Sequence, residues 1–167
     1  MRWIPLVFCA ACGGASAESP LTVSLGLTHD ATEQALHAHQ FCREPGQVNS
    51  DKEVFPRCDR AAAEVSDAWV QAIFDHDRLV ELRRFERFTE DARAVERWNE
   101  LVAQRMKSAT PSDEAVQQLR DKGLLPAGTR TVKAFRGEGD TVIGVYLLTP
   151  TEPERANVLE QISYVKQ

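Results

Sequence analysis

The sequence predicts an α+β domain in which mostly amphipathic helices pack on a small antiparallel sheet of about three strands. Two observations predict the sheet. Apolar and polar residues alternate over residues 21–27, and two β-rich runs near the C-terminus flank a turn with two glycines. A third observation predicts the helices: apolar residues recur every three or four positions over much of the remaining chain, which is typical of helices that bury one side.

The first 17 residues have the composition of an export signal. Arg2 precedes an apolar run over residues 3–11, and small residues follow that run. A charged start, a short apolar centre and a small-residue cleavage region are what the export machinery selects, and the apolar run is too short to span a bilayer. We therefore expect residues 1–17 to direct the chain out of the cytoplasm.

Two cleavage sites fit this signal, and they give different mature proteins. Ala10-Ala11-Cys12-Gly13 resembles the lipobox of bacterial lipoproteins, with Cys9 where leucine is usual. The resemblance implies that Cys12 is lipidated and becomes the first residue, and that residues 13–20 form a flexible tether. The alternative is Ala15-Ser16-Ala17, an A-x-A site for ordinary signal peptidase, which would release a soluble protein.

Residues 21–167 are expected to form a single globular domain, because a chain of this length can bury its own core. The whole chain has a formal net charge of −5 and no basic block, so nucleic acid is not an expected partner. The sequence shows no internal repeat and no second long apolar segment. Membrane attachment would therefore depend on the lipid alone.

Cys42 and Cys58 are the two cysteines of the expected domain, and we predict that they form a disulfide. Turn-forming residues lie between them, so the bridge would join the end of one helix to the start of the next. A metal site or a redox pair is the rival interpretation, but this pair lacks C-x-x-C spacing and the histidines are scattered. His37 and His39 stand on opposite sides of a predicted helix and cannot share a metal; surface or capping roles are expected for both, and for His29.

Four or five helices are predicted in chain order. The first begins at Asp30, which forms a capping box with Glu33. The second begins near Pro56 and extends past Val80. The helical pattern restarts at Thr89, either as a third helix after a break near Phe88 or as a continuation of the second. A short helix ends at Gly123, and a last helix follows residue 151. The apolar positions that define the second and last helices are Val65, Trp69, Ala72, Ile73, His76 and Val80, and Val158, Leu159, Ile162 and Val165, respectively.

Residues 130–136 and 141–148 are expected to form a hairpin, and residues 21–27 to pair with it. Because residues 141–148 are apolar on both sides, we expect that strand to lie in the middle of the sheet. Trp69 and Trp98 fall on apolar helix faces and are expected in the core.

Asp75-His76-Asp77 is the most suggestive cluster for chemistry, because a carboxylate beside an imidazole can serve acid–base catalysis. On a helix the three side chains would diverge, so we expect His76 to be a partly buried structural residue and Asp75 and Asp77 to flank it. No other stretch matches a catalytic, cofactor or metal motif, and no cofactor is expected.

These observations favour an exported envelope protein that acts as a non-enzymatic binding or accessory domain, held on a membrane by lipid at Cys12. Its expected partner is an envelope protein or another envelope component. The alternative is a small exported hydrolase that uses the region of His76. The enzyme hypothesis requires a concave pocket around His76, whereas the binding hypothesis requires an exposed apolar patch.

Overall fold

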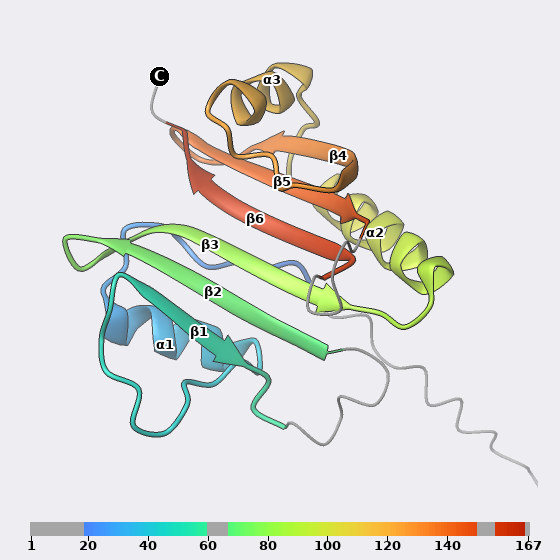
Figure 1. The fold of residues 1–167 in the computed structure, drawn as a ribbon. Coiled ribbons are helices and arrows are strands. Elements are labelled where there is room, and N and C mark those ends of the chain that lie inside the picture. The colour runs from blue at the N-terminus through green and yellow to red at the C-terminus, as the bar shows by residue number, and fades with distance from the viewer. Residues whose placement is uncertain (1–18, 60–66, 150–155, 166–167) are drawn as a thin grey trace, which may run out of the picture.

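The computed structural model describes residues 19–59, 67–149 and 156–165. In these residues, three helices flank one antiparallel sheet of six strands (Figure 1). The strands lie in the order β1-β2-β3-β6-β5-β4. The helices are α1 His29–Ala38, α2 Asp91–Arg105 and α3 Asp113–Asp121, and the strands are β1 Lys52–Pro56, β2 Asp67–Asp75, β3 Arg78–Arg87, β4 Thr129–Arg136, β5 Thr141–Leu148 and β6 Val158–Tyr164.

The sheet consists of two halves, and each half is a three-stranded meander that follows one or two helices. In the first half α1 is followed by the three-stranded meander β1-β2-β3, and in the second half α2 and α3 are followed by the meander β4-β5-β6. Antiparallel pairing of β3 with β6 joins the halves in the middle of the sheet. The topology therefore contains a repeat that the residue pattern of the sequence does not reveal.

The helices cover the two faces of the sheet unequally (Figure 1). On one face, the two-helix face, Leu36 of α1 and Leu101 of α2 belong to the larger apolar core. On the opposite face, the α3 face, Ala115 and Leu119 of α3 pack in a smaller core with Tyr146 of β5. Helix α3 lies over β4 and β5, so it covers the second half of the sheet.

The predicted fold of mostly helices on a sheet of about three strands is wrong. The described residues form six strands and only three short helices. Two segments that were expected to be helices are strands, and the segment that was expected to be the first strand is not one.

From residue 67 onward, the helix predicted to begin near Pro56 is replaced by the β2–β3 hairpin; Val65, which was assigned to that helix, lies outside the described residues. In β2 every second residue from Ala68 to Phe74 is buried, as in a strand. Trp69 and Ile73 lie on the other side and are partly buried. Because both sides of β2 carry apolar residues, the apolar positions include a set spaced three or four apart, which imitates a helix.

The last predicted helix is also wrong over residues 158–164, which form β6; its expected start after residue 151 lies outside the described residues. All the residues of β6 before Tyr164 are buried, since β6 lies between β3 and β5 and is covered on both faces. Glu160, Gln161 and Ser163 are therefore buried polar residues. Because these polar residues are interspersed with apolar ones, the sequence pattern resembles that of an amphipathic helix with a solvent-exposed side.

Residues 21–27 cross the two-helix face without joining the sheet as a strand. Leu21 and Val23 are buried and Thr22 and Ser24 are exposed, so the alternation in the sequence is real. The expected pairing with residues 141–148 is wrong, because β5 pairs with β4 and β6. Residues 141–148 were expected in the middle of the sheet, but β5 lies next to the edge strand β4, and β3 and β6 occupy the middle.

Elements with clear end signals were predicted correctly. Ser112 caps α3 by accepting a hydrogen bond from the Ala115 amide at 3.1 Å, and Gly123 follows the helix with a positive φ of 67°. The β4–β5 hairpin and α2 lie where they were expected. Helix α1 begins earlier than predicted, because the side chain of Thr28 caps it in place of Asp30.

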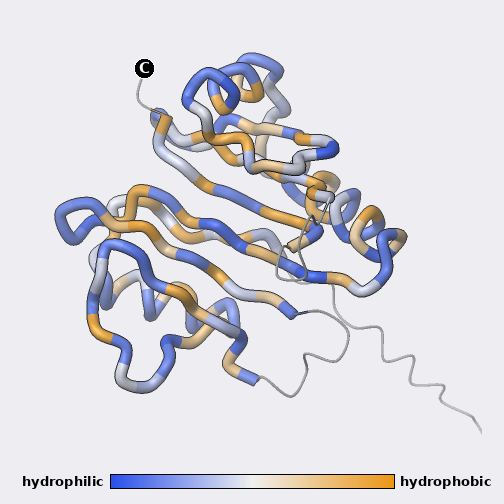
Figure 2. The backbone as a smooth tube through the Cα atoms, in the orientation of Figure 1, coloured by the Kyte–Doolittle hydropathy of each residue, from blue (hydrophilic) through white to orange (hydrophobic). Residues whose placement is uncertain are grey.

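Trp69 and Trp98 were expected in the core. Both are only partly buried. Trp98 on α2 lies against the two-helix face and donates its indole N–H to the carbonyl of Val145 at 3.1 Å. Trp69 lies on the α3 face, where its ring stacks on Phe85 of the neighbouring strand. Figure 2 shows the corresponding mixture of hydrophobic and hydrophilic positions along β2 and β3.

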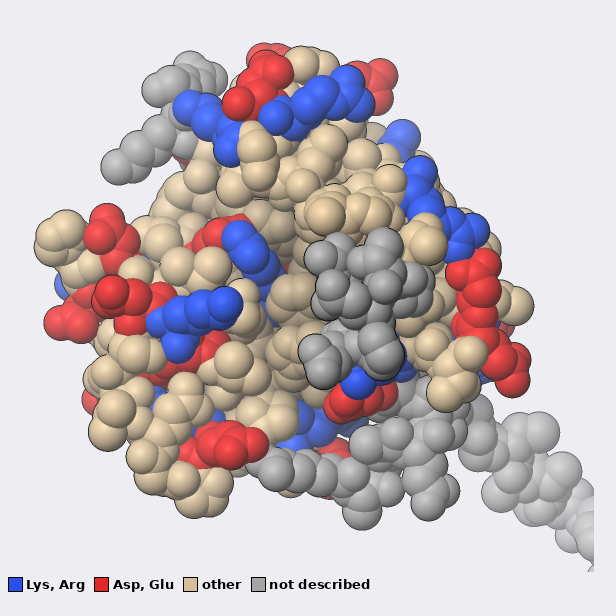
Figure 3. All heavy atoms as spheres, in the orientation of Figure 1, with Lys and Arg blue, Asp and Glu red and all other residues tan. Residues whose placement is uncertain are grey.

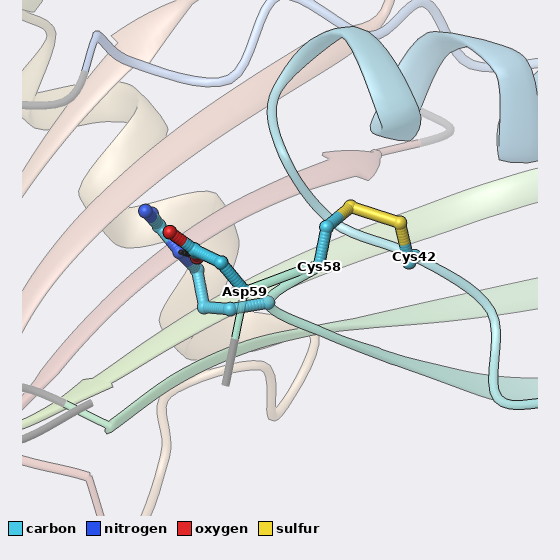
Figure 4. The surroundings of a disulfide bond; sticks show 4 residues. Cys42, Cys58 and Asp59 are labelled. Carbon is cyan, nitrogen blue, oxygen red and sulfur yellow. Dashed lines mark ion pairs between the residues drawn. A yellow bond between two sulfur atoms is a disulfide. The ribbon is translucent and has the colours of Figure 1, made fainter. Parts of the chain in front are cut away.

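The predicted disulfide between Cys42 and Cys58 is present (Figure 4). It joins the segment after α1 to the segment after β1, so its second end is not the start of a helix. Backbone hydrogen bonds flank the bridge: the amide of Cys42 donates to Pro56 O, and the amide of Cys58 donates to Gln40 O, each at 2.9 Å. Within the described residues, no helix has the length and hydropathy needed to cross a membrane.

We expect the disulfide to stabilise the protein by closing the loop between Cys42 and Cys58. The double variant C42S/C58S should lose about 3 kcal/mol of unfolding free energy in urea, as estimated from the chain entropy of a loop of about 15 residues. A reductant should lower the midpoint of the wild type and leave that of the double variant unchanged. Equal midpoints for the two proteins without reductant would contradict this expectation.

Candidate functional site

The Asp75-His76-Asp77 cluster forms the turn of the β2–β3 hairpin. Asp75 pairs with Arg78, so His76 and Asp77 are the two residues of the turn. Both have positive φ, 48° and 58°, as a tight hairpin turn of this handedness requires. The His76 side chain is 93% exposed and its Nδ1 lies 2.8 Å from Asp75. The expected partly buried position on a helix is therefore wrong.

The turn brings Asp77 to a different histidine, His29 at the start of α1. The Nε2 atom of His29 lies 3.3 Å from Asp77, and its Nδ1 atom lies 2.7 Å from the buried carboxylate of Glu53. Its ring also stacks on Phe74, with centroids 3.8 Å apart. His29 is buried, and not at the surface as predicted. Both ring nitrogens face carboxylates, so this histidine ties α1 to β1 and to the hairpin.

A second cluster of charged side chains lies on the two-helix face, between α2 and the strands that it covers. Glu86 of β3 accepts two hydrogen bonds from Arg97 of α2, at 2.8 and 3.0 Å, and lies 2.5 Å from Arg84. Farther along α2, Arg105 pairs with Glu160 of β6 at 2.7 Å. All five side chains are buried, so the ion pairs are shielded from water.

These buried ion pairs also hold the N-terminal segment of the domain through its backbone. Arg84 donates to the carbonyl of Ser19 at 2.9 Å, and Arg105 donates to the carbonyl of Leu21 at 2.5 Å. The amide of Leu21 donates to Glu160 at 3.1 Å. The chain therefore enters the domain on the two-helix face.

The proximity of the charges shifts their pKa values. Burial would raise the pKa of Glu86, but the charge of Arg84 and the hydrogen bonds and charge of Arg97 outweigh burial and lower it. Burial lowers the pKa of Arg84, with Glu86 opposing that shift. Hydrogen bonds and charge from Glu86 outweigh burial at Arg97 and raise its pKa. Glu86 is therefore held as an anion between the two arginines.

A polar cluster occupies the centre of the α3 face, on the two strands that join the halves. Glu81 and Arg83 of β3 stand opposite Ser163 and Gln161 of β6. Arg83 donates two hydrogen bonds to Glu81, at 2.8 and 3.0 Å, and Ser163 donates to Glu81 at 3.2 Å. The amide of Gln161 donates to both Glu81 and Ser163. The cluster thereby fixes the direction of the Arg83 guanidinium.

Tyr146 closes the buried end of this cluster. Its ring lies over Gly144, where a Cβ atom would come within 2.5 Å of the Tyr146 hydroxyl oxygen. The hydroxyl is buried and has no hydrogen-bond partner among the described residues. Burial raises the pKa of Tyr146, the charge of Glu81 adds to that shift and Arg83 opposes it. A glycine inside an otherwise apolar strand was the sequence signal for this close approach.

The first half of the α3 face presents large side chains that are partly buried or, at Val54, exposed. We call this the β1–β3 surface; its members are Val54, Trp69, Gln71, Ile73, Arg83, Phe85 and Arg87. Trp69 and Phe85 stack with centroids 5.0 Å apart, and the Arg87 guanidinium lies 5.3 Å from the centre of the Trp69 ring. Figure 3, in the orientation of Figure 1, shows uncharged atoms with interspersed acidic and basic side chains on this side.

A separate cleft of about 980 Å³ lies between residues 21–25, the end of α2 and the β4–β5 turn. Arg105 and Arg136 are among its lining residues, together with Tyr164. Neither His76 nor its two neighbouring aspartates line this cleft. The described residues also place His37 beside the two disulfide sulfurs as a group that could hold a metal, although sulfurs that are bonded to each other are not thiolate ligands.

Comparisons with known proteins found no matching family model, no matching curated protein and no matching solved structure.

Glu86 is predicted to be essential for stability, because removing it leaves two buried arginines without their shared anion. Glu86→Gln should lower the free energy of unfolding by about 3–5 kcal/mol at neutral pH. The control is Glu96→Gln on the exposed side of α2, whose partner Arg93 is itself exposed, and it should cost less than about 1 kcal/mol. Urea unfolding of the two variants makes the comparison, and similar losses would contradict the prediction.

The difference in unfolding free energy between the wild type and Glu86→Gln should depend on pH. Because the pKa of Glu86 is lowered in the folded state, its contribution is fully present above its ordinary value of 4.5 and is lost as the pH falls through the folded value. The stability gap between the wild type and Glu86→Gln should therefore shrink below about pH 4.5. A gap that widens on acidification would show that the sign is wrong.

Proposed function

We propose that this protein is an exported, lipid-anchored binding domain that contacts an envelope protein through the β1–β3 surface. The observation that carries the proposal is the unequal covering of the sheet: α3 packs on β4 and β5, while aromatic and arginine side chains remain partly exposed on β2 and β3. Tyrosine, tryptophan and arginine side chains dominate the energetics of protein interfaces. An aromatic stack beside ordered charges therefore fits a protein partner.

The position of the chain entry supports this arrangement. Ser19 and Leu21 are held on the two-helix face by Arg84, Arg105 and Glu160, on the opposite side of the sheet from the β1–β3 surface. From Cys12 to Ser19 the chain can reach at most about 25 Å. A lipid at Cys12 would keep the domain close to the membrane and leave the α3 face available to a partner.

The position of His76 favours binding over hydrolysis. A hydrolase would need His76 in a concave site, with a second polar group that orients it and space for a substrate. His76 instead stands in an exposed turn, and its ring contacts Asp75 next to it in sequence. The disulfide fits an oxidising compartment outside the cytoplasm, which the binding proposal requires.

The lipid anchor is tested by Cys12→Ser. We expect mass spectrometry of the membrane fraction from the native host to show a diacylated N-terminus at residue 12, because the lipobox-like sequence ends there. Cys12→Ser should release the protein or leave it unprocessed, whereas Cys9→Ser should leave lipidation intact. An unmodified mature chain that starts at Glu18 would refute the anchor and leave the binding surface untouched.

The binding surface is tested by photo-cross-linking in cells. A photoreactive residue at Gln71, in the centre of the β1–β3 surface, should give a discrete cross-linked species, because its side chain would lie within the interface. The control position is Gln117, exposed on α3, which should give none. Arg83→Gln removes the positive charge without placing a second carboxylate beside Glu81, and it should reduce the adduct formed from position 71. Urea unfolding checks that the variant is folded under the cross-linking conditions.

Equal adducts from positions 71 and 117, or none at position 71, would contradict this assignment of the surface. If Cys12→Ser abolishes the adduct from position 71, the partner is membrane-bound and is contacted only by the anchored protein.

A further inference from the structure

His37 lies beside the Cys42–Cys58 disulfide, so three side chains with metal-ligating atoms come together there. His37 comes from the last turn of α1, Cys42 from the segment that follows it, and Cys58 from the segment after β1. One nitrogen of His37 and the two Sγ atoms all lie within 4.8 Å of one another. Figure 4 shows the disulfide next to α1. This cluster is separate from the β1–β3 surface, so an inference about it does not depend on the proposed function.

The backbone holds the two cysteines together independently of the bond between their sulfurs. Cys42 donates to Pro56 O, Cys58 donates to Gln40 O, and Phe41 forms an antiparallel pair with Arg57 between these bonds. The Phe41 side chain is buried in the larger core and anchors this pairing. If the disulfide is reduced, these contacts keep the two thiols side by side, because none of them uses a sulfur atom.

The cluster is also open to solvent. His37 and Cys58 are exposed and Cys42 is partly buried. A groove of about 490 Å³ runs along the outer side of α1 and ends at His37, with Asp30, Glu33 and Gln34 as its other lining residues. A reductant and a hydrated metal ion can therefore both reach the site.

We propose that reduction converts the Cys42–Cys58 disulfide into a zinc site completed by His37. A dithiol reductant transfers two electrons and two protons to the S–S bond and is itself oxidised to a disulfide. Zinc binding then releases the two thiol protons to solvent, since thiolate is the ligand form. Two thiolates and one imidazole are preferred zinc ligands, and water supplies the fourth position of the tetrahedron.

The ligand spacing suits this change. In a tetrahedral site with Zn–S bonds of about 2.3 Å the two sulfurs stand roughly 3.7 Å apart, so they need to separate from bonding distance by less than about 2 Å. Rotation about the cysteine χ1 bonds can supply this movement while the flanking backbone hydrogen bonds stay in place. Reoxidation would bring the sulfurs back into a bond and expel the metal.

The test uses the full chain in which C9S and C12S remove the other two thiols of the sequence. The protein is reduced with a phosphine, and Co²⁺ is added as a spectroscopic probe, with Zn²⁺ as competitor. The reduced protein should bind one Co²⁺ per chain and show thiolate-to-cobalt charge-transfer absorption, which Zn²⁺ abolishes. The oxidised protein should show no such band.

His37→Ala identifies the third ligand. Loss of an outer-shell partner alone weakens metal sites about 10–100-fold, so removal of a ligand should weaken Co²⁺ binding by at least about tenfold. His39→Ala is the matched control, since His39 lies two residues later and contacts Thr22 at 3.1 Å, and its affinity should equal that of the parent. His37 is exposed, so its replacement leaves the fold intact, which circular dichroism checks.

Three results would overturn the proposal: no charge-transfer band in the reduced parent, an equal band in the oxidised parent, or unchanged affinity in His37→Ala. The last result would reduce the site to a pair of thiols.

Discussion

The antiparallel pairing of β3 with β6 is the constraint on which the rest of the structure depends, because among the described residues it is the only strand pairing between the two meanders. Charged side chains of β3 and β6 project from both faces of the sheet at this pairing. On the two-helix face Arg84 lies opposite Glu160, and on the α3 face Arg83 lies opposite Gln161. A slip of the register by one residue would move each side chain to the other face and separate the buried charges from their partners. The polar residues therefore specify the pairing more strictly than apolar residues could.

The charges on the two-helix face extend this control beyond the sheet. Arg97 and Arg105 reach from one side of α2 to carboxylates on β3 and β6, so the helix can dock in one position only. Arg84, which also contacts Glu86, holds the backbone carbonyl of Ser19, and Arg105 holds that of Leu21. Buried ion pairs contribute little net stability compared with apolar packing, but leaving one of these charges unpaired is costly. Their effect is thus to select one arrangement of helix, sheet and N-terminal segment.

Local signals explain what the sequence could predict. A cap at Ser112, a glycine at position 123 and a glycine-containing turn each act within a few residues, so α3 and the β4–β5 hairpin were predicted. The β2–β3 turn lacks such a signal, since His76 and Asp77 adopt positive φ without glycine. Strand β6 was missed because its buried polar residues find partners on distant elements, such as Glu160 with Arg105. The proximity of His37 to the cysteines was equally hidden, because it depends on how α1 meets the end of β1.

The two faces of the sheet differ in how they use their charged side chains. On the two-helix face Arg84, Arg97 and Arg105 are each committed to a buried carboxylate or a backbone carbonyl. On the α3 face Gln161, Arg83 and Gln71 stand opposite one another on β6, β3 and β2. Gln161 is buried, the Arg83 side chain is about one-third exposed, and Gln71 is partly buried, so accessibility increases away from β6. Buried Gln161 and Ser163 hold Glu81, and Glu81 holds Arg83. An arginine oriented in this way has already lost most of its conformational freedom, so a partner that binds it loses less entropy on association.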